Sequence, residues 1–330
     1  MAECVRVITL ADGKYAMPLA VTVRSLLEHH VSPRRLEITI IDGGLTNDDR
    51  RRLERSWEGA TSAPARWKFT APRFHVAGEF PVWGRVPQLT YARLSIGDYF
   101  EAGEQRAVLL DSDMLVLADI AEFHDSDLRG AVIGACRDPF IPTVSSIDGL
   151  ADWKQVGLAS DSPYFNAGAM VVDLDQWRRQ RITVRVAEFI DRHRDRLNQY
   201  DQDGLNAILA GAWTELDPRW QCHPRLEHAL GVRLASDPFI VHFSGRLKPW
   251  LYNAGHPLDR LYFDVLNRTE WRGVHPARTL SSLAMSLYDS PLRRVFYPLE
   301  VRLMAQVRKV QKLVSAAGVG VRDATRNESD

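Results

Sequence analysis

The amino-acid sequence predicts an α/β fold in which helices flank a mostly parallel β-sheet. Strand-like and helix-like segments alternate through the first half of the 330 residues. A buried strand-like run also ends in paired carboxylates, and open α/β sheets place their ligands at such strand ends. After Trp250 the alternation fades. We therefore expect a sheet-containing domain over residues 1–250 and a C-terminal extension over residues 251–330.

Each element is predicted from a local pattern. Short β-branched or apolar runs predict strands, and apolar residues spaced three or four apart predict amphipathic helices. The turn-forming Asp42-Gly43-Gly44 ends the second strand, and Thr46 is a typical N-cap for the helix that follows. The expected strands are residues 5–11, 36–41, 67–70, 107–110, 131–135, 169–174 and 239–243. The expected helices are residues 17–30, 46–57, 89–100, 184–196 and 204–210.

Composition excludes several functional classes. The 42 basic side chains equal the 42 acidic ones, so no bulk positive charge is available for nucleic acid. The three cysteines, Cys4, Cys136 and Cys222, lie far apart, which argues against a disulfide framework and against a zinc site. The sequence has no signal-peptide pattern and no apolar stretch near the roughly 18–20 residues of a membrane span. We expect a cytoplasmic protein.

Asp111-Ser112-Asp113 follows the apolar run at residues 107–110. In an extended segment, residues two apart project to the same side, so both carboxylates can face one cation. Oxygen ligands suit Mg²⁺ or Mn²⁺, which also bind the phosphates of substrates. The alternative is a strand-end turn whose aspartates are solvated.

A second polar segment runs from His242 to Trp250. A neutral imidazole is a competent Mn²⁺ ligand. Gly245 would let the backbone approach a phosphate closely, and Lys248 supplies a point charge for a diphosphate. This spacing of histidine, glycine and lysine favours a phosphate and metal site over a structural histidine at a strand end.

Five motifs carry a family resemblance that covers about residues 5–250. They are Thr-Tyr-Ala-Arg-Leu at 90–94, Leu-Leu-Asp-Ser-Asp-Met-Leu-Val at 109–116, Tyr-Phe-Asn-Ala-Gly at 164–168, Tyr-Asp-Gln-Asp at 200–203, and His-x-x-Gly-x-x-Lys-Pro-Trp at 242–250. In these motifs and their order the chain resembles the retaining glycosyltransferases of family 8. That family includes the bacterial lipopolysaccharide galactosyl- and glucosyltransferases and glycogenin.

The resemblance implies a GT-A fold, in which a Rossmann-like mixed sheet is flanked by helices. It implies retaining transfer of a hexose, galactose or glucose, from a UDP-sugar to a glycan, lipid-linked or small-molecule acceptor. Asp111, Asp113 and His242 would hold Mn²⁺, with Mg²⁺ as the alternative. Asp12 would contact the uracil, and Tyr15 would pack on its ring.

The remaining residues implied by the resemblance surround the donor sugar and the diphosphate. The candidate catalytic residues are Asp138, Asp201 and Gln202. The further donor-binding residues are Arg93, Asp111, Ser112, Asn166, Ala167, Gly245 and Lys248.

Two other functions remain open at this point. Aspartyl phosphohydrolases also place D-x-D after a buried strand, and Asp111 would then be the nucleophile and Asp113 the acid/base. Such enzymes usually carry Thr or Val where this chain has Leu115, and residues 242–250 are left without a role. A non-catalytic nucleotide-sugar-binding module is the third hypothesis.

The segment at residues 293–314 contains a predicted basic amphipathic helix that begins at Pro298, a residue suited to a first helical turn, with Phe296 and Tyr297 just before it. This pattern is typical of an interfacial membrane helix, here on the inner membrane face. Packing on the catalytic domain or on a second copy in a homodimer is the equal alternative. The apolar positions are Leu299, Leu303, Val307, Val310 and Val314, and the basic ones are Arg302, Arg308, Lys309 and Lys312.

Overall fold

The computed structural model describes residues 4–74, 88–230, 236–245, 248–252, 256–288 and 293–316. Its strands are β1 (Cys4–Ala11), β2 (Arg35–Asp42), β3 (Ala65–Thr70), β4 (Arg106–Leu110), β5 (Met114–Val116), β6 (Ile133–Arg137), β7 (Phe165–Asp173), β8 (Trp213–Glu215) and β9 (Ile240–His242). Its α-helices are α1 (Ala16–His29), α2 (Asn47–Trp57), α3 (Ile120–His124), α4 (Leu174–Arg179), α5 (Ile182–Arg192), α6 (Asp201–Ile208), α7 (Arg225–Leu230), α8 (Pro257–Leu266), α9 (Leu280–Tyr288) and α10 (Arg293–Ala316). Its 3₁₀ helices are η1 (Gly13–Tyr15), η2 (Gln88–Asp98), η3 (Arg194–Arg196) and η4 (Pro218–Gln221).

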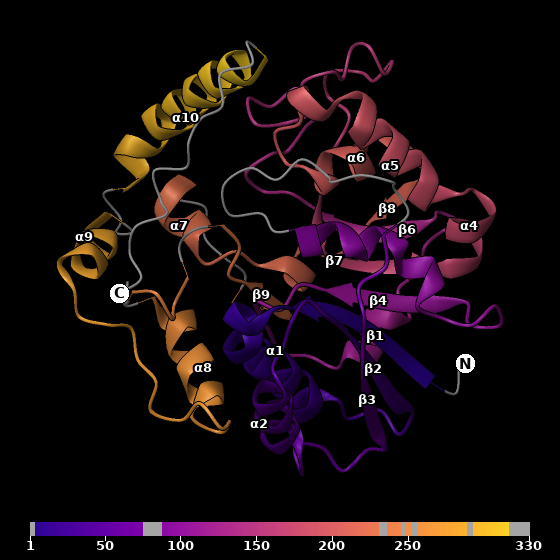
Figure 1. Ribbon diagram of the computed structural model, residues 1–330, viewed down its shortest axis with the longest axis vertical. Coiled ribbons are helices and arrows are strands. Elements are labelled where there is room, and N and C mark those ends of the chain that lie inside the picture. Colours follow the sequence, from indigo (N-terminus) through magenta and orange to yellow (C-terminus); the bar gives the residue numbers. More distant parts are fainter. Residues whose placement is uncertain are drawn as a thin grey trace.

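A seven-stranded sheet of order β3-β2-β1-β4-β7-β6-β8 lies at the centre (Figure 1). Strands β3, β2, β1 and β4 are parallel, whereas β7 is antiparallel to both of its neighbours. The predicted α/β fold with a mixed sheet and a Rossmann-like half is therefore confirmed. β5 and β9 form a separate antiparallel pair.

Alternate residues of β1 supply two hydrophobic cores, one on each face of the sheet. Val5 and Val7 pack in the core that holds α1 and α2. Ile8 and Leu10 pack in the core that holds η2, α5 and α6. Figure 1 shows α1 and α2 well separated from α4, α5 and α6.

The strand order reverses between β1 and β4, which are neighbours in the sheet although β2 and β3 lie between them in sequence. Open α/β sheets bind ligands at the carboxyl ends of the strands at such a point. Asp12 directly follows β1, and Asp111 directly follows β4. The topology therefore places these two predicted site residues at the same edge of the sheet.

Two predicted helices differ in detail from expectation. The helix expected at residues 89–100 is present as η2, a 3₁₀ helix with a kink at Ser95. Pro298 was expected in the first turn of the C-terminal helix, but α10 begins five residues earlier, at Arg293. Pro298 therefore lies inside the helix, where its missing amide removes one backbone hydrogen bond.

Helices α8, α9 and α10 lie along one side of the molecule (Figure 1). Tyr262, Leu266 and Trp271 pack in the same core as α1, so this part of the extension is attached to the sheet domain. The domain boundary near residue 250 stays a prediction. Among the helices that the structure describes, none combines the length and the apolar composition needed to span a membrane.

Candidate active site and metal centre

The pairing of β5 with β9 brings together two motifs that are far apart in sequence. Asp111 and Asp113 lie in the loop between β4 and β5. Met114 is the register partner of His242 in the antiparallel pair. The amide of Phe243 also donates to the carbonyl of Asp113, at 3.0 Å. His242 is thereby placed beside both carboxylates.

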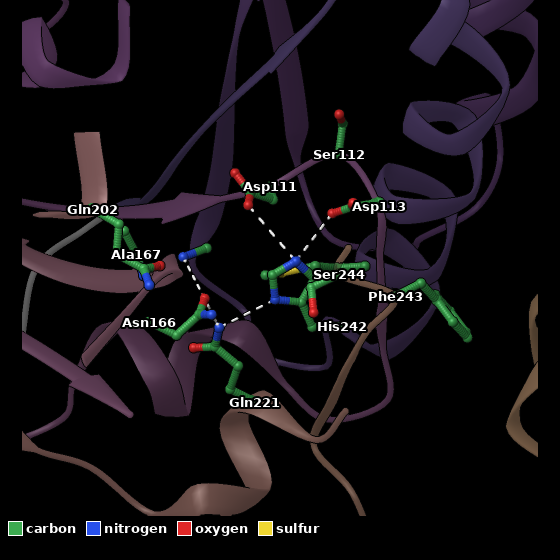
Figure 2. A network of polar contacts seen from close by, with 12 residues as sticks. Asp111, Ser112, Asp113, Asn166, Ala167, Gln202, Gln221, His242, Phe243 and Ser244 are labelled. Atoms are coloured by element: carbon green, nitrogen blue, oxygen red, sulfur yellow. Dashed lines mark hydrogen bonds and ion pairs between the residues drawn. The ribbon is translucent and has the colours of Figure 1, made fainter. Parts of the chain in front are cut away.

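Asp111, Asp113 and His242 form a cluster whose ligand atoms lie within 4.8 Å of one another (Figure 2). The Nε2 atom of His242 lies 3.2 Å from Asp113 Oδ1 and 3.7 Å from Asp111 Oδ2. Ser112 projects to the other side of the loop (Figure 2). Two carboxylates and one imidazole are a suitable donor set for Mg²⁺ or Mn²⁺.

Asp113 Oδ1 is buried and accepts no well-aligned hydrogen bond from the described residues; the group that faces it is His242 Nε2, at 3.2 Å. A buried carboxylate oxygen needs a positive partner, so a cation shared by this oxygen and the imidazole would stabilise it. The residues present therefore fit a divalent metal ion.

Lys248 holds the other oxygen of the same carboxylate. Its ammonium group contacts Asp113 Oδ2 and donates to the carbonyl of Phe243 at 2.6 Å. Burial alone would raise the pKa of Asp113, but the charges of Lys248 and His242 outweigh it and hold that pKa below its usual range. The Asp113 carboxylate is therefore ionised. Gly245, between these residues, has a φ of 74° that favours glycine.

Arg93 forms ion pairs with Asp111 and with Asp201. It is nearly buried, and its guanidinium group lies 2.9 Å from Asp111 Oδ1 and 3.2 Å from Asp201 Oδ2. Burial raises the pKa of Asp201 to about 6; the Arg93 charge opposes this shift and Asp111 adds to it. Because two carboxylates share one guanidinium group, the negative charge here is only partly compensated.

Gly168 leaves the space that the cluster needs. Its carbonyl accepts from the amide of Asp111 at 2.7 Å. A Cβ atom at this position would lie 2.5 Å from His242 Cε1 and 2.9 Å from Asp111 Oδ2. Only glycine therefore fits without moving two of the three candidate metal ligands.

A network of amides and one carboxylate adjoins the cluster. Asp138 Oδ2 accepts from Asn166 at 2.8 Å and from Gln202 at 3.2 Å. The Gln202 side-chain oxygen accepts from the amide of Ala167 at 2.9 Å. Burial raises the pKa of Asp138, and these donors oppose the shift. The candidate sugar-binding residues are thus held in one orientation by each other.

Gln221 links this network to the metal cluster. Its amide nitrogen contacts Asn166 Oδ1 and lies 3.1 Å from His242 Nδ1 (Figure 2). This contact fixes the orientation of the ring, in which Nε2 is the atom that faces the carboxylates.

The residues expected at the nucleotide lie close to Lys248. Asp12 Oδ1 accepts from the amides of Lys14 and Tyr15, at 3.0 and 3.1 Å, and so caps η1. The Tyr15 and Trp250 rings pack edge to face at 6.2 Å. The Lys248 ammonium lies 5.9 Å from the Tyr15 ring centroid. The structure therefore brings Asp12, Tyr15 and Lys248 to one end of the site.

Sequence reasoning missed two other groups that position the site. The Thr22 hydroxyl of α1 lies 3.0 Å from the Ser112 carbonyl and 2.7 Å from the Met114 carbonyl, and thereby holds the D-x-D loop. Ser25 accepts from the amide of Val116 at 2.9 Å. The available signal was two hydroxyl residues, three apart, within the apolar face of the expected helix. Gln221 has no such signal in its surrounding sequence.

Comparison with known proteins agrees with this geometry. The profile of the family described as Glycosyl transferase family 8 matches residues 6–254. General stress protein A of Bacillus subtilis (strain 168) is 30% identical over 292 residues, which cover 82% of this chain and 96% of that protein. The lipopolysaccharide 1,2-glucosyltransferase of Escherichia coli (strain K12) is 21% identical over 286 residues, 83% of this chain and 81% of that protein.

Solved structures show the same fold. The galactosyltransferase LgtC in complex with donor and acceptor sugar analogs gives a TM-score of 0.67 at 22% identity, and the match covers 85% of this chain and 100% of that one. The Rossmann-like half-sheet and this likeness show the GT-A fold, and the family profile makes the chain a glycosyltransferase. Within this class, the chain belongs to glycosyltransferase family 8.

Substitution of Gly168 tests whether the cluster binds a cation. Gly168→Ala should weaken Mn²⁺ binding at least about tenfold, because the added methyl group displaces His242 and Asp111. Isothermal titration with MnCl₂ measures the affinity. Gly103→Ala is the matched control, since a Cβ there meets nothing within 4 Å. Equal Mn²⁺ affinity in the wild type and in Gly168→Ala would contradict the assignment.

The raised pKa of Asp201 predicts how the stability of the protein, without added divalent ion, depends on pH. Its folded-state pKa of about 6 lies above the ~3.9 of an unfolded aspartate. The folded state therefore binds the extra proton between these values, and the free energy of unfolding falls as pH rises through this window. Between about pH 4 and 7 the free energy of unfolding of the wild type should fall by ~2–3 kcal/mol more than that of Asp201→Asn. Urea unfolding at several pH values in this range measures both free energies. If they change with pH in the same way in the two proteins, the raised pKa of Asp201 is contradicted.

Proposed function

We propose that the protein transfers a hexose, galactose or glucose, from a UDP-sugar to a glycan, lipid-linked or small-molecule acceptor, with retention of anomeric configuration. One observation carries the proposal. Asp111, Asp113 and His242 converge beside the fixed charges of Arg93 and Lys248. Metal ligands combined with fixed cations suit a diphosphate leaving group.

The leaving group determines what these residues do. Asp111, Asp113 and His242 would hold Mn²⁺, or less effectively Mg²⁺, which would act as a Lewis acid on the donor diphosphate. Lys248 would add a positive charge next to the same phosphates. Its ammonium group is held by the Phe243 carbonyl, so little reorganisation is needed as negative charge develops.

Asp201 and Gln202 would stabilise the positive charge that develops on the sugar. The Asp201 carboxylate, shared with Arg93, would stabilise that charge electrostatically. The Gln202 side-chain oxygen is fixed by the Ala167 amide. An amide oxygen is a poor nucleophile, which favours attack by the acceptor on the same face of the sugar over a covalent intermediate. Asp138 and Asn166 would bind the sugar hydroxyls.

The phosphohydrolase hypothesis fits the site less well. In that mechanism Asp113 must donate a proton, yet Lys248 and His242 hold its pKa below the usual range. Asp111, the required nucleophile, is ion-paired with Arg93 at 2.9 Å. Both features favour charge neutralisation and cation binding over attack by a carboxylate.

Metal-dependent turnover tests the proposed activity. UDP-galactose or UDP-glucose with Mn²⁺ should release UDP, and EDTA should abolish the release. Asp113→Asn should lower the rate at least about 100-fold, since it removes a charge from the cation site. The exposed Asp161→Asn is the control, with thermal unfolding to verify both folds. Full activity in EDTA would contradict the metal role. Release of inorganic phosphate would indicate a phosphohydrolase, and binding without turnover a non-catalytic module.

We also propose that α10 attaches the protein to an anionic membrane surface, on the inner membrane face. Arg293 and Tyr297 lie on the face of α10 toward the catalytic domain, and Tyr297 contacts Phe140. Leu299 and Leu303 lie on another face, with exposed fractions of 64% and 60%. The exposed Arg302 lies between them. An apolar stripe next to basic residues is complementary to anionic lipid.

Vesicle binding tests this attachment on the full chain. Wild-type protein should cosediment with phosphatidylglycerol vesicles at low salt and be released at high salt. The double variant Leu299→Ser/Leu303→Ser should stay in the supernatant, because it removes the apolar contacts. Val31→Ser is the control, since Val31 is 81% exposed outside the tail. Wild-type protein in the supernatant at low salt would contradict the proposal. A dimer that the double variant loses would favour the homodimer instead.

A further inference from the structure

A row of aromatic rings leads from the metal cluster to the C-terminal helix. The rings of His242 and His223 are 5.0 Å apart, and the ring of His223 meets Phe140 edge to face at 5.8 Å. Phe140 in turn lies 6.2 Å from Tyr297 of α10. Segments that are distant in sequence thus form one continuous strip beside the site.

The Phe140 end of this strip is fixed to the candidate sugar-binding residues. Asp138 Oδ1 accepts from the amide of Phe140 at 2.9 Å, while Oδ2 of the same carboxylate binds Asn166 and Gln202. The backbone at Phe140 is therefore anchored to the carboxylate that would contact the donor sugar. Phe140 is only partly buried, so part of its ring can accept a ligand.

The Tyr297 end is held from within α10. The guanidinium group of Arg293 lies 5.2 Å from the Tyr297 ring centroid, and Arg293 is ion-paired with Glu300 at 3.4 Å. Burial raises the pKa of Tyr297 to about 12, and the charges of Glu300, Asp148 and Asp138 add to the shift while Arg293 opposes it. Tyr297 therefore carries a protonated hydroxyl in the electrostatic field of Asp138.

We propose that Phe140 and Tyr297 form the platform on which the acceptor sugar packs its apolar ring face. This inference rests on the proposed transferase function and names the acceptor subsite. A pyranose ring has an apolar C–H face for aromatic rings and hydroxyl groups for nearby carboxylates. The nucleotide end has its own ring pair in Tyr15 and Trp250. Phe140 and Tyr297 would supply a second pair, next to Asp138, for the acceptor sugar.

The platform also gives the C-terminal extension a role in acceptor binding. Tyr297 lies well beyond residue 254, where the match to the family profile ends. Acceptor binding would therefore depend on a part of the chain outside the residues that match the family profile. Acceptor choice and the position of α10 would be coupled through Tyr297.

Glycoside binding tests the platform. The probes are methyl β-D-galactopyranoside, methyl α-D-glucopyranoside and methyl β-lactoside, titrated by saturation-transfer NMR onto full-length protein saturated with UDP and Mn²⁺. Tyr297→Ala and Phe140→Ala should each raise the Kd of the bound glycoside roughly tenfold. Tyr297→Phe keeps the ring and should stay within about twofold of the wild type. Phe296→Ala, a neighbouring ring that is 56% exposed, is the matched control.

Two further measurements separate the possible failures. UDP affinity and thermal unfolding verify that each variant is folded with an intact nucleotide end. An unchanged Kd in both alanine variants, an equal loss in Phe296→Ala, or no binding of any probe to wild-type protein would overturn the platform. Release of UDP from the UDP-sugar by the wild type is scored independently. If that release is absent, the proposed function itself fails.

Discussion

The antiparallel pairing of β5 with β9 is the interaction on which the site depends. Each strand has only three residues, yet their register places His242 opposite Met114 and so beside Asp113. Such short strands are not stable alone, and both pack in the larger hydrophobic core. Thr22 attaches the same loop to α1. The geometry of the cation site is thus a consequence of how the core is built.

The same arrangement concentrates buried charge, which costs stability unless each charge is paired. Arg93 and Lys248 supply that pairing for Asp111, Asp201 and Asp113. They would also face the phosphates of a donor, so the groups that balance these carboxylates are the ones a diphosphate would use. Asp113 Oδ1, which faces His242 Nε2, lies where a cation is expected. Stability and proposed function therefore depend on the same few contacts.

Most strands of the sheet were predicted, because the apolar runs and turn residues that specify a strand lie within a few residues of one another. Each of the seven expected strands is present, and Thr46 caps α2 through a capping box with Asp49. β5 and β8, which have three residues each, were not predicted. The kink in η2 and the start of α10 before Pro298 depend on packing that sequence spacing does not record.

Some residues of the candidate site could be predicted from the sequence, and others could not. Asp111, Asp113 and His242 could be selected from motifs, because metal ligands must be particular residue types. Gln221 and Phe140 could not, since their roles come from contacts made across the fold. Motifs identify the groups that touch a ligand directly. The groups that orient them become visible only when distant segments are placed side by side.

Electron–nuclear spectroscopy of bound Mn²⁺ tests the central claim most directly. In the complex with UDP, the Mn²⁺ signal should show coupling to one imidazole ¹⁴N and to the ³¹P nuclei of the diphosphate. The ¹⁴N coupling should disappear in His242→Gln while the ³¹P coupling remains. Mn²⁺ that binds without imidazole coupling, or without coupling to phosphorus, would contradict a cation site built by Asp111, Asp113 and His242 for a nucleotide diphosphate.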